Sequence, residues 1–508
     1  MMVLDLLGNG DPEAIAIAAP GRSGLSYADL CALCTATIAS LKEHGLGAND
    51  RVAIVLPNGP ELAACFVALA SNVAAAPLNP TYTAAEYRFY LENLNAKAIV
   101  VAAGIETPVR NVAQKLGINV IELEFIIAGP AGQFVLNYGA MPLHANDSSA
   151  NATDTALVLH TSGTTSRPKL VPLSQENLCA SAAHICTTLG LTDGDNCLNV
   201  MPLFHIHGLV ACVLSSLKAG ASVTCTPGFN ALKLFSWLEA IRPSWYSAVP
   251  TMHQAILERA ERNQAIVENT KLRFIRSSSS SLPAPVMRQL EATFSCPVIE
   301  SYGMTEAAHQ MTSNSLPPGS RKAGSVGIPA GPEVRLMDVD GAFVNKREEG
   351  EIVIRGANVT SGYEANDDAN RAAFATDPDG VANWFRTGDQ GVFDAEGFLT
   401  ISGRLKEIIN RGGEKIAPRE VDDVLMDHAA VAQIVTFAVV HAKLGEDVAA
   451  AVVLRDGMAA TERELRDFAG ARLAAFKVPR KIVFLDEIPT GSTGKIQRIG
   501  LADKLGLN

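Results

Sequence analysis

Short apolar segments alternate with longer segments of helical spacing through most of the first 320 residues. An apolar run of roughly four to eight residues predicts a buried strand, and apolar residues repeated at helical intervals predict a helix. Strands and helices in alternation indicate an α/β architecture with largely parallel sheets. The segments with strand character are 51–57, 96–103, 222–227 and 272–278, and those with helical character include 59–72 and 284–294.

The pattern changes after about residue 320 to short strands joined by turns. The sequences DVDG (338–341) and DAEG (394–397) are typical hairpin connections, so a β-rich subdomain is expected here. Beyond Arg404, helical segments flank a strand, which predicts a small α+β domain. We therefore expect a large N-terminal domain over residues 1–403, with α/β sheets and the β-rich subdomain, and a small C-terminal domain over residues 404–508.

Composition narrows the class of protein. A chain of 508 residues is too long for one ordinary core, and a hydrophobic fraction of 48% with 19% charged residues is typical of a globular protein. The net charge of −11 argues against a nucleic-acid partner, whose phosphates require a basic surface. It leaves small anionic ligands open, because a local basic pocket can exist in an acidic protein.

The nine cysteines are scattered and predict neither a disulfide framework nor a metal site. The only close pair, Cys31 and Cys34, lies in a segment of helical spacing, so we expect free, buried thiols in a reducing compartment. The N-terminus lacks a secretory signal pattern, and no apolar run approaches membrane-spanning length. These features predict a cytoplasmic protein without a membrane partner.

Residues 159–174 (LHTSGTTSRPKLVPLS) gather five hydroxyl residues and a glycine ahead of Lys169. An apolar run precedes this segment and a helical one follows, with Ser174 as the expected N-cap, so the loop is predicted to lie between a buried strand and a helix. Backbone N–H groups and hydroxyls in such a loop can converge on an oxyanion, and Lys169 adds charge. The segment is not a Walker A loop, and a solvated turn remains the alternative.

Two further polar segments follow predicted strands. Residues 277–281 are five consecutive serines, a composition typical of linkers, but here they join a strand to a helix at the sheet edge where α/β proteins bind ligands. Residues 298–311 (VIESYGMTEAAHQM) have the same predicted strand–loop–helix shape. They offer Tyr302 for stacking, Thr305 for hydrogen bonding and Glu306 as an oxygen ligand for Mg²⁺. The alternative is an aromatic residue beside a capping box.

Charged residues closer to the C-terminus complete the set: Asp389, Arg404, Lys406 and Lys495. Each alone is typical of a turn or an exposed surface. Together and in order, however, the motifs TSGTTxxPK, YGMTE, TGD, GRxKExI and a late GK resemble the adenylate-forming superfamily of acyl-CoA synthetases, luciferases and peptide-synthetase adenylation domains. The resemblance covers nearly the whole chain and is most specific over residues 160–500.

The resemblance implies a two-step reaction. A carboxylate attacks the α-phosphate of Mg·ATP to give an acyl-adenylate and pyrophosphate, and a thiol, usually that of coenzyme A, then displaces AMP. Negative charge grows on the α-phosphate and on the leaving pyrophosphate, so fixed cations and hydrogen-bond donors stabilise the transition state. ATP, Mg²⁺, CoA and a small carboxylic acid are the ligands to expect.

The resemblance also implies residue roles. Thr305 contacts the α-phosphate, Glu306 binds Mg²⁺, and Lys495 reaches the acid and phosphate during adenylation. Tyr302 stacks on adenine opposite Ser279, Ser280 and Ser281, while Asp389 binds the ribose with Arg404 nearby. The remaining residues expected around ATP are Thr161, Ser162, Gly163, Thr164, Thr165 and Lys169 in the phosphate loop, and Ser301 and Gly303 beside Tyr302.

In this superfamily the small C-terminal domain is mobile and swings between the half-reactions. Lys406 occupies the hinge position, and after rotation Gly412 and Gly413 approach the channel of the thiol. The sequence departs from the family pattern at Ser166 and Leu170, where glycine is common. These residues could stiffen the phosphate loop, but neither departure removes a reacting group.

The acid must be inferred from less specific residues. His205 stands where CoA ligases of the superfamily carry a gating histidine and amino-acid-activating domains have aspartate, so amino-acid activation is not expected. The pair His205 and His207 lacks an apparent third metal ligand. Trp245 and Tyr246 could block a fatty-acid tunnel or simply be core. Polar residues gather in the same region, namely Arg276, Ser279, Ser280, His253 and His309, and an apolar acid would leave them unpaired at about 1–3 kcal/mol each.

A small, doubly charged acid would satisfy these groups. The motifs PLFHIHG, LRFIRSSSSSL, YGMTEAAHQM and NRGGEKIAPREVD are most similar to the oxalate–CoA ligase branch, which implies oxalate as substrate, its second carboxylate held by Ser280, His309 and His205. The alternatives are a malonate, medium-chain or aryl acid–CoA ligase, a non-catalytic nucleotide-binding homologue and a luciferase-like oxygenase.

Overall fold

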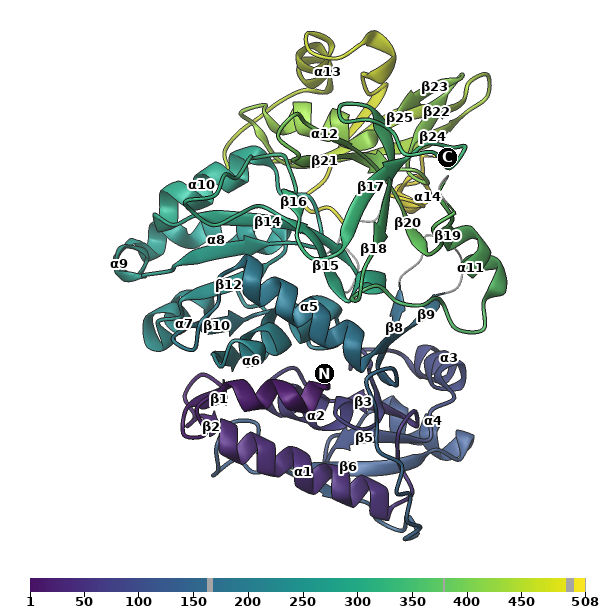
Figure 1. The fold of residues 1–508 in the computed structure, drawn as a ribbon. Helices are drawn as coiled ribbons and strands as arrows, with labels where there is room; N and C mark the ends of the chain where they lie inside the picture. Colours follow the sequence, from purple (N-terminus) through teal and green to yellow (C-terminus); the bar gives the residue numbers. More distant parts are fainter. Residues whose placement is uncertain (162–167, 378–379, 490–497, 508) are drawn as a thin grey trace.

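The computed structural model describes residues 1–161, 168–377, 380–489 and 498–507 (Figure 1). Two large sheets form the body of the N-terminal part, as the alternation of strands and helices predicts. In the seven-stranded sheet the central strands are parallel, and its order is β7-β6-β5-β3-β4-β8-β9. Its strands are β3 (Arg51–Val55), β4 (Ala74–Pro77), β5 (Ala98–Ala102), β6 (Asn119–Phe125), β7 (Phe134–Asn137), β8 (Thr155–Thr161) and β9 (Lys169–Ser174).

The nine-stranded sheet has the order β16-β15-β14-β13-β12-β10-β11-β1-β2. Strands β10 to β14 pair in parallel, so their carboxyl ends share one edge. The strands are β1 (Ile15–Ala18), β2 (Leu25–Ser26), β10 (Asn196–Asn199), β11 (Ser222–Cys225), β12 (Trp245–Ala248), β13 (Phe274–Ser277), β14 (Val298–Met304), β15 (His309–Ser313) and β16 (Ile328–Pro329).

Helices fill the space between these two sheets and cover their outer faces (Figure 1). Helix α2 (Pro60–Ala70) is buried along its whole length and contacts strands of both sheets, as does α5 (Gln175–Thr188). A π-helix, His207–Leu214, runs beside them into α6 (Ser215–Lys218), and these segments form the largest apolar core with both sheets. The outer helices are α1 (Tyr27–Glu43), α3 (Ala84–Leu94), α4 (Pro108–Leu116), α7 (Leu234–Ile241), α8 (Pro250–Ala260), α9 (Gln264–Asn269) and α10 (Ala284–Phe294).

The expected β-rich subdomain is present as a third, antiparallel sheet of order β17-β18-β20-β19, with β21 on β20. The DAEG turn joins β20 to β21, and DVDG leads from β17 into a bridge between Met337 and Phe343. The elements are β17 (Glu333–Met337), β18 (Glu349–Arg355), α11 (Asp367–Ala373), β19 (Phe374–Ala375), β20 (Trp384–Phe393) and β21 (Leu399–Arg404).

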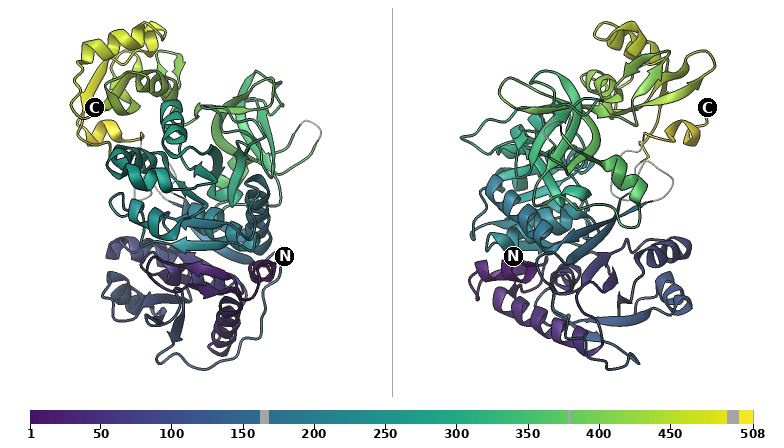
Figure 2. Two further views of the ribbon diagram at one scale, coloured as in Figure 1. Left: turned by 90° about the vertical axis from the view of Figure 1, so that its left-hand side faces the viewer. Right: turned by 45° about the vertical axis from the view of Figure 1, so that its right-hand side comes forward.

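The last part of the chain forms a small α+β unit at the opposite end of the molecule from the seven-stranded sheet (Figure 2). Its sheet has the order β23-β22-β25-β24 with β26 on β25, and it has apolar clusters of its own. The elements are β22 (Ile409–Arg411), β23 (Glu414–Ile416), α12 (Pro418–Met426), β24 (Val431–His441), β25 (Gly445–Leu454), α13 (Glu462–Gly470), β26 (Lys481–Phe484) and α14 (Leu501–Lys504). The boundary at residues 403–404 stays a prediction.

Three local expectations were wrong. Strand β9, antiparallel to β8, follows the phosphate-loop segment, so that segment joins two strands and the helix begins only after Ser174, its confirmed N-cap. After β14 the chain makes only a 3₁₀ turn, Thr305–Ala307, because Ala308 and His309 adopt positive φ angles of 45° and 107° that end the helical turn. All nine cysteines are free, but Cys31 is exposed and Cys186 half-buried rather than buried. Within the described ranges, none of the helices is long and apolar enough to cross a membrane.

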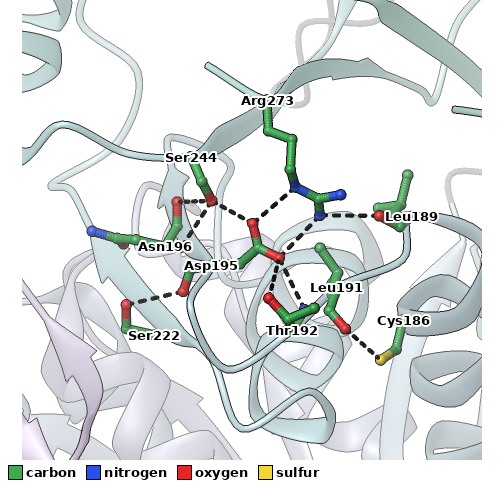
Figure 3. A network of polar contacts seen from close by, with 9 residues as sticks. All are labelled: Cys186, Leu189, Leu191, Thr192, Asp195, Asn196, Ser222, Ser244 and Arg273. Atoms are coloured by element: carbon green, nitrogen blue, oxygen red, sulfur yellow. Dashed lines mark hydrogen bonds and ion pairs between the residues drawn. The ribbon is translucent and has the colours of Figure 1, made fainter. Parts of the chain in front are cut away.

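A polar network joins the starting ends of β10, β12 and β13 (Figure 3). Asp195, just ahead of β10, accepts hydrogen bonds from the Oγ of Ser244 (2.7 Å) and from Arg273 Nε and Nη2 (3.1 and 3.0 Å). Ser244 and Arg273 immediately precede β12 and β13. The network therefore fixes three parallel strands in register, and the carboxyl ends of those strands carry the candidate site.

Candidate active site

The ribose-binding carboxylate predicted from the TGD motif is held from two sides. Asp389 on β20 lies opposite Arg404 on β21, whose Nε donates to Asp389 Oδ1 over 2.7 Å. The hydroxyl of Tyr302, at the end of β14, donates to Asp389 Oδ2 over 2.5 Å. Asp389 raises the pKa of Arg404, and burial, followed by Asp389, raises the pKa of Tyr302. The three residues thus form one charged, hydrogen-bonded unit, while stacking of Tyr302 on adenine stays a prediction.

Tyr302 reaches this position because β14 and β15 approach each other very closely. A Cβ atom at Gly303 would lie 1.6 Å from the carbonyl oxygen of His309, so only glycine fits there. Ser301 is buried, and its backbone carbonyl accepts a hydrogen bond from the Oγ of Ser278 over 2.9 Å. Ser301 and Gly303, both expected at the nucleotide, therefore have at least a structural role.

The expected metal and phosphate residues lie on either side of a tyrosine that the sequence did not single out. Glu306, in the 3₁₀ turn, is 6% exposed, and its Oε1 accepts a hydrogen bond from the Tyr363 hydroxyl over 2.8 Å. Lys169 Nζ lies 4.1 Å from the centroid of the Tyr363 ring. Burial raises the pKa of Glu306, and burial, then Lys406, lowers the pKa of Lys169. Thr161 pairs with Lys169 across the β8–β9 ladder, and Thr305 begins the 3₁₀ turn.

These residues fit Mg²⁺ held together with ATP. Within the described part of the chain, no group of three His, Cys, Asp or Glu residues could hold a metal ion alone, which also leaves the His205–His207 pair without a third such ligand. Magnesium is commonly bound through one or two carboxylates, substrate phosphates and water, so one buried carboxylate near the lysine predicted to hold the phosphates suffices.

The serine run forms the expected connection between β13 and α10. Ser279 has a left-handed φ of 72° and turns the chain, and its Oγ lies 3.0 Å from His207 Nδ1. Ser280 is exposed at the tip of the turn. The Oγ of Ser281 is buried without a hydrogen-bond partner among the described residues.

Arg276 lies at the centre of a buried polar cluster on one face of the nine-stranded sheet. Its Nη1 is 3.5 Å from both His207 Nε2 and Ser247 Oγ, and its Nη2 is 3.5 Å from His309 Nδ1 and 3.4 Å from Gln310 Oε1. His207 Nε2 also lies 2.6 Å from Ser247 Oγ. The rings of His207 and His309 meet edge-on at 4.9 Å.

The charge of Arg276 is not neutralised by a carboxylate within the described structure. The side chain has no solvent exposure, its Nε has no described partner, and burial lowers its pKa to about 10. A buried cation is ordinarily paired, because leaving water without a counter-charge costs several kcal/mol. The cluster is therefore chemically incomplete and suited to an anion.

The sequence predicted this polar region and Arg276 within it, but it did not indicate that His207 lies beside Arg276. His207 was considered only as half of a metal pair, yet it begins the π-helix, a form that often marks functional sites, and its Nε2 lies 3.5 Å from Arg276. His253 is fully buried beside the same strands, with 3.4 Å between its Nδ1 and the hydroxyl of Tyr246. Tyr246 and Trp245 are fully buried in apolar clusters, which supports the interpretation that they are core.

Several predicted residues lie away from these clusters or outside the described structure. Gly412 and Gly413 form the turn between β22 and β23 with φ angles of 62° and 101°, a conformation that favours glycine. Lys406 follows β21 in a turn anchored by a hydrogen bond from Leu405 N to Gly388 O. The residues that lie outside the described ranges are Ser162, Gly163, Thr164, Thr165, Ser166 and Lys495.

Comparison with known proteins agrees with this geometry. Residues 7–364 match the model of the family "AMP-binding enzyme", and residues 420–495 match "AMP-binding enzyme C-terminal domain". The chain belongs to the AMP-binding enzyme family. As a member of it, the protein is an ATP-dependent acid–CoA ligase that forms an acyl-adenylate and releases AMP.

The relatives of this AMP-binding enzyme cover almost its whole length. It is 42% identical to the oxalate–CoA ligase of Arabidopsis thaliana, over 96% of this chain and 95% of the relative. It is 40% identical to the oxalate–CoA ligase of Saccharomyces cerevisiae, over 90% and 87% of the two chains. Its fold matches ATP-bound MatB from Rhodopseudomonas palustris with a TM-score of 0.86, at 28% identity and 99% coverage of both chains.

Proposed function

We propose that this enzyme is an oxalate–CoA ligase, which converts oxalate, ATP and CoA into oxalyl-CoA, AMP and pyrophosphate. The observation that carries the proposal is the buried cluster around Arg276, a cation without a carboxylate partner among the described residues. Oxalate has two carboxylates. One must face the α-phosphate of ATP, and the other would bring to Arg276 the negative charge that the cluster lacks.

The cluster also argues for a small diacid over an apolar acid. Arg276, His207, His309 and Ser247 are all at most 3% exposed, so an acid that reaches them is shielded from bulk water. An alkyl chain would leave the buried charge of Arg276 without a counter-charge, which costs several kcal/mol. Arginine suits the role because its planar fork matches a carboxylate with two parallel hydrogen bonds.

The rest of the proposed site supplies the chemistry at phosphorus. Asp389, held by Tyr302 and Arg404, would bind the ribose hydroxyls, and Lys169 with the phosphate loop would hold the phosphates. Mg²⁺ bound at Glu306 would neutralise charge on the phosphates. Lys495 would approach the reacting carboxylate and the α-phosphate during adenylation, and CoA would enter past Gly412 and Gly413. Positioned cations of this kind stabilise the charge that develops on phosphate oxygens.

The hydrogen bonds of the described residues revise the proposed contacts of the acid. They join His309 and His207 to Arg276, so these three become the proposed contacts of the second carboxylate. Ser280 is exposed at the tip of its turn, and its role and that of His205 stay predictions. The oxalate–CoA ligases of A. thaliana and S. cerevisiae support the choice of oxalate over other small diacids.

The test measures pyrophosphate release with Mg·ATP, with and without CoA, on oxalate, malonate, acetate, octanoate, benzoate and coumarate. We expect turnover on oxalate with CoA and little on the others. A preference for octanoate or an aryl acid would keep the ligase but reject the diacid site. A preference for malonate would keep the Arg276 site but change its ligand, and no turnover with ATP still bound would indicate a non-catalytic homologue.

Substitutions test which residues determine the specificity for the acid. His309→Ala and Arg276→Gln should raise the KM for oxalate at least tenfold, about the value of one charge-assisted hydrogen bond, and change the KM for ATP little. His44→Ala is the matched control, because this histidine stacks on Tyr138 with ring centroids 3.8 Å apart and has its Nδ1 2.9 Å from Ser40 O, so it belongs to neither the Arg276 cluster nor the proposed nucleotide site. Equal effects on both KM values would assign His309 and Arg276 to folding rather than to substrate binding.

A further inference from the structure

A seven-residue segment, 358–364 (NVTSGYE), ties together the metal and phosphate halves of the proposed ATP site. On one side, Thr360 N donates to Glu306 O over 2.7 Å. On the other side, Thr360 Oγ1 donates to Pro172 O on β9 over 2.7 Å, and Glu364 N donates to Leu170 O over 3.2 Å. The segment thus spans from the 3₁₀ turn of Glu306 to the strand that begins with Lys169.

Tyr363 is the residue of this segment that faces both charges, and its backbone is fixed. Its N–H donates to Asn370 Oδ1 and its carbonyl accepts from Asn370 Nδ2, each over 2.7 Å. The side chain is 8% exposed, with its hydroxyl 2.8 Å from Glu306 Oε1 and its ring 4.1 Å from Lys169 Nζ. Two hydrogen bonds to one side chain and burial leave the phenol little freedom.

The ring therefore stands between an ammonium and a carboxylate. A direct ion pair between Lys169 and Glu306 would neutralise both charges. Lys169 would then attract ATP less strongly, and Glu306 would attract Mg²⁺ less strongly. A lysine over an aromatic face gains only about 0.5–2 kcal/mol, so a phosphate can replace that contact. The phenol occupies a single lone pair of Glu306 and leaves the carboxylate its negative charge and its remaining acceptor sites.

We infer that Tyr363 is a positioning residue that keeps Lys169 and Glu306 apart and orients Glu306 towards the metal. The inference rests on the proposed roles of these two residues in binding Mg·ATP. It explains why a tyrosine, and not an aliphatic residue, lies between these two charges: the ring contacts Lys169 and the hydroxyl contacts Glu306.

Two substitutions separate the ring from the hydroxyl. Tyr363→Phe keeps the ring between the charges but removes the hydrogen bond to Glu306, so the Mg²⁺ concentration for half-maximal ATP binding should rise about tenfold. Binding of ATP without Mg²⁺ should change less than twofold. Tyr363→Leu removes the ring as well, lets Lys169 pair with Glu306, and should weaken ATP binding about tenfold even without Mg²⁺.

Binding is measured on the full-length protein with a fluorescent ATP analogue, in EDTA and across a Mg²⁺ titration, with neither acid nor CoA present. Failure of the oxalate proposal therefore leaves this result unaffected. In a Glu306→Gln background, Tyr363→Leu should no longer weaken Mg²⁺-free binding, because no carboxylate remains to capture Lys169. Tyr87→Phe is the control, since this buried tyrosine donates to the Asn79 carbonyl over 3.0 Å.

The separator role is rejected if Tyr363→Leu weakens Mg²⁺-free binding equally with and without the Glu306 charge. The orienting role is rejected if Tyr363→Phe leaves the Mg²⁺ requirement at the wild-type value. If both variants only lower the Tm, as is expected of Tyr87→Phe, Tyr363 is a packing residue.

Discussion

At the scale of single residues, Glu300 shows how this protein uses burial to change the behaviour of a carboxyl group. Glu300 on β14 has no exposure, and its Oε1 accepts a hydrogen bond from Leu282 N over 2.9 Å. Its Oε2 has no hydrogen-bond partner within the described ranges. Burial raises its pKa to about 7, with Arg419 of α12 acting in the opposite direction.

This shift predicts a pH dependence of stability. The raised pKa means that the folded chain holds a proton on Glu300 between about pH 4.5 and pH 7, where the unfolded chain has released it. The stabilisation is present at low pH and is lost as pH rises through about 7. Glu300→Gln, neutral at every pH, should therefore gain stability over wild type between pH 5 and pH 8, by at most about 3 kcal/mol. Urea unfolding at both pH values checks this, with exposed Glu258→Gln as the control. A constant difference from wild type would contradict it.

At the scale of elements, the Asp195 network of Figure 3 holds the three strands whose residues form the proposed acid-binding site. Asp195 joins the starts of β10, β12 and β13, and the last two strands carry Ser247 and Arg276 in register. A strand rises about 3.3 Å per residue, so the network acts from roughly 10 Å away. Positions at the site thus depend on polar contacts at the opposite ends of the same strands.

We therefore expect Asp195→Asn to affect both folding and substrate binding. Its carboxylate is 4% exposed and neutralises Arg273, so the loss should lower the free energy of unfolding by about 1–3 kcal/mol. The KM for oxalate should rise more than the KM for ATP, because Arg276 shifts with β13. Steady-state kinetics and urea unfolding measure these effects, with exposed Asp193→Asn as the matched control. Unchanged kinetics in a destabilised variant would limit the network to stability.

At the scale of the whole molecule, the small C-terminal unit touches the large one through few described polar contacts. Gln254 Nε2 on α8 donates to Ala432 O over 3.3 Å, and α12 packs against β21. The connection runs through the turn at Lys406, shortly after Arg404, which donates a hydrogen bond to Asp389. The rotation predicted from the family resemblance would turn about this point, bring Gly412 and Gly413 towards the proposed site and leave Asp389 in place.

We predict that Lys406→Pro separates the two half-reactions, because proline restricts the φ change that a hinge must make. Pyrophosphate release in the first turnover should stay within about threefold of wild type, while oxalyl-CoA formation falls at least tenfold. Rapid-quench measurement of both products tests this. Lys406→Ala removes the same side chain without restricting the backbone, so equal defects in the two variants would assign the effect to the lysine charge.

The sequence predicts those features of this structure that depend on residues close together in the chain, and it misses those that depend on residues far apart. Local signals identified the N-cap Ser174, the hairpin turn DAEG and the serine turn, because each is decided by a few neighbouring residues. The 3₁₀ turn after Met304 was missed, since the close approach of β15 and the left-handed angles at Ala308 and His309 set it. The same limit hid Tyr363, which lies 57 positions from its hydrogen-bond partner Glu306. Only folding brings such groups together.

The buried charge of Arg276, which has no carboxylate partner among the described residues, also has a consequence for the lifetime of the protein in the cell. A ligand that binds only the folded state stabilises it, by about 2.7 kcal/mol at a hundred times its dissociation constant. Proteases degrade unfolded chains, so such a difference can change abundance several-fold. We expect the half-life of this enzyme to lengthen when the proposed diacid substrate accumulates and to shorten when that diacid is consumed. The supply of substrate would then adjust the amount of catalyst, without any change in transcription.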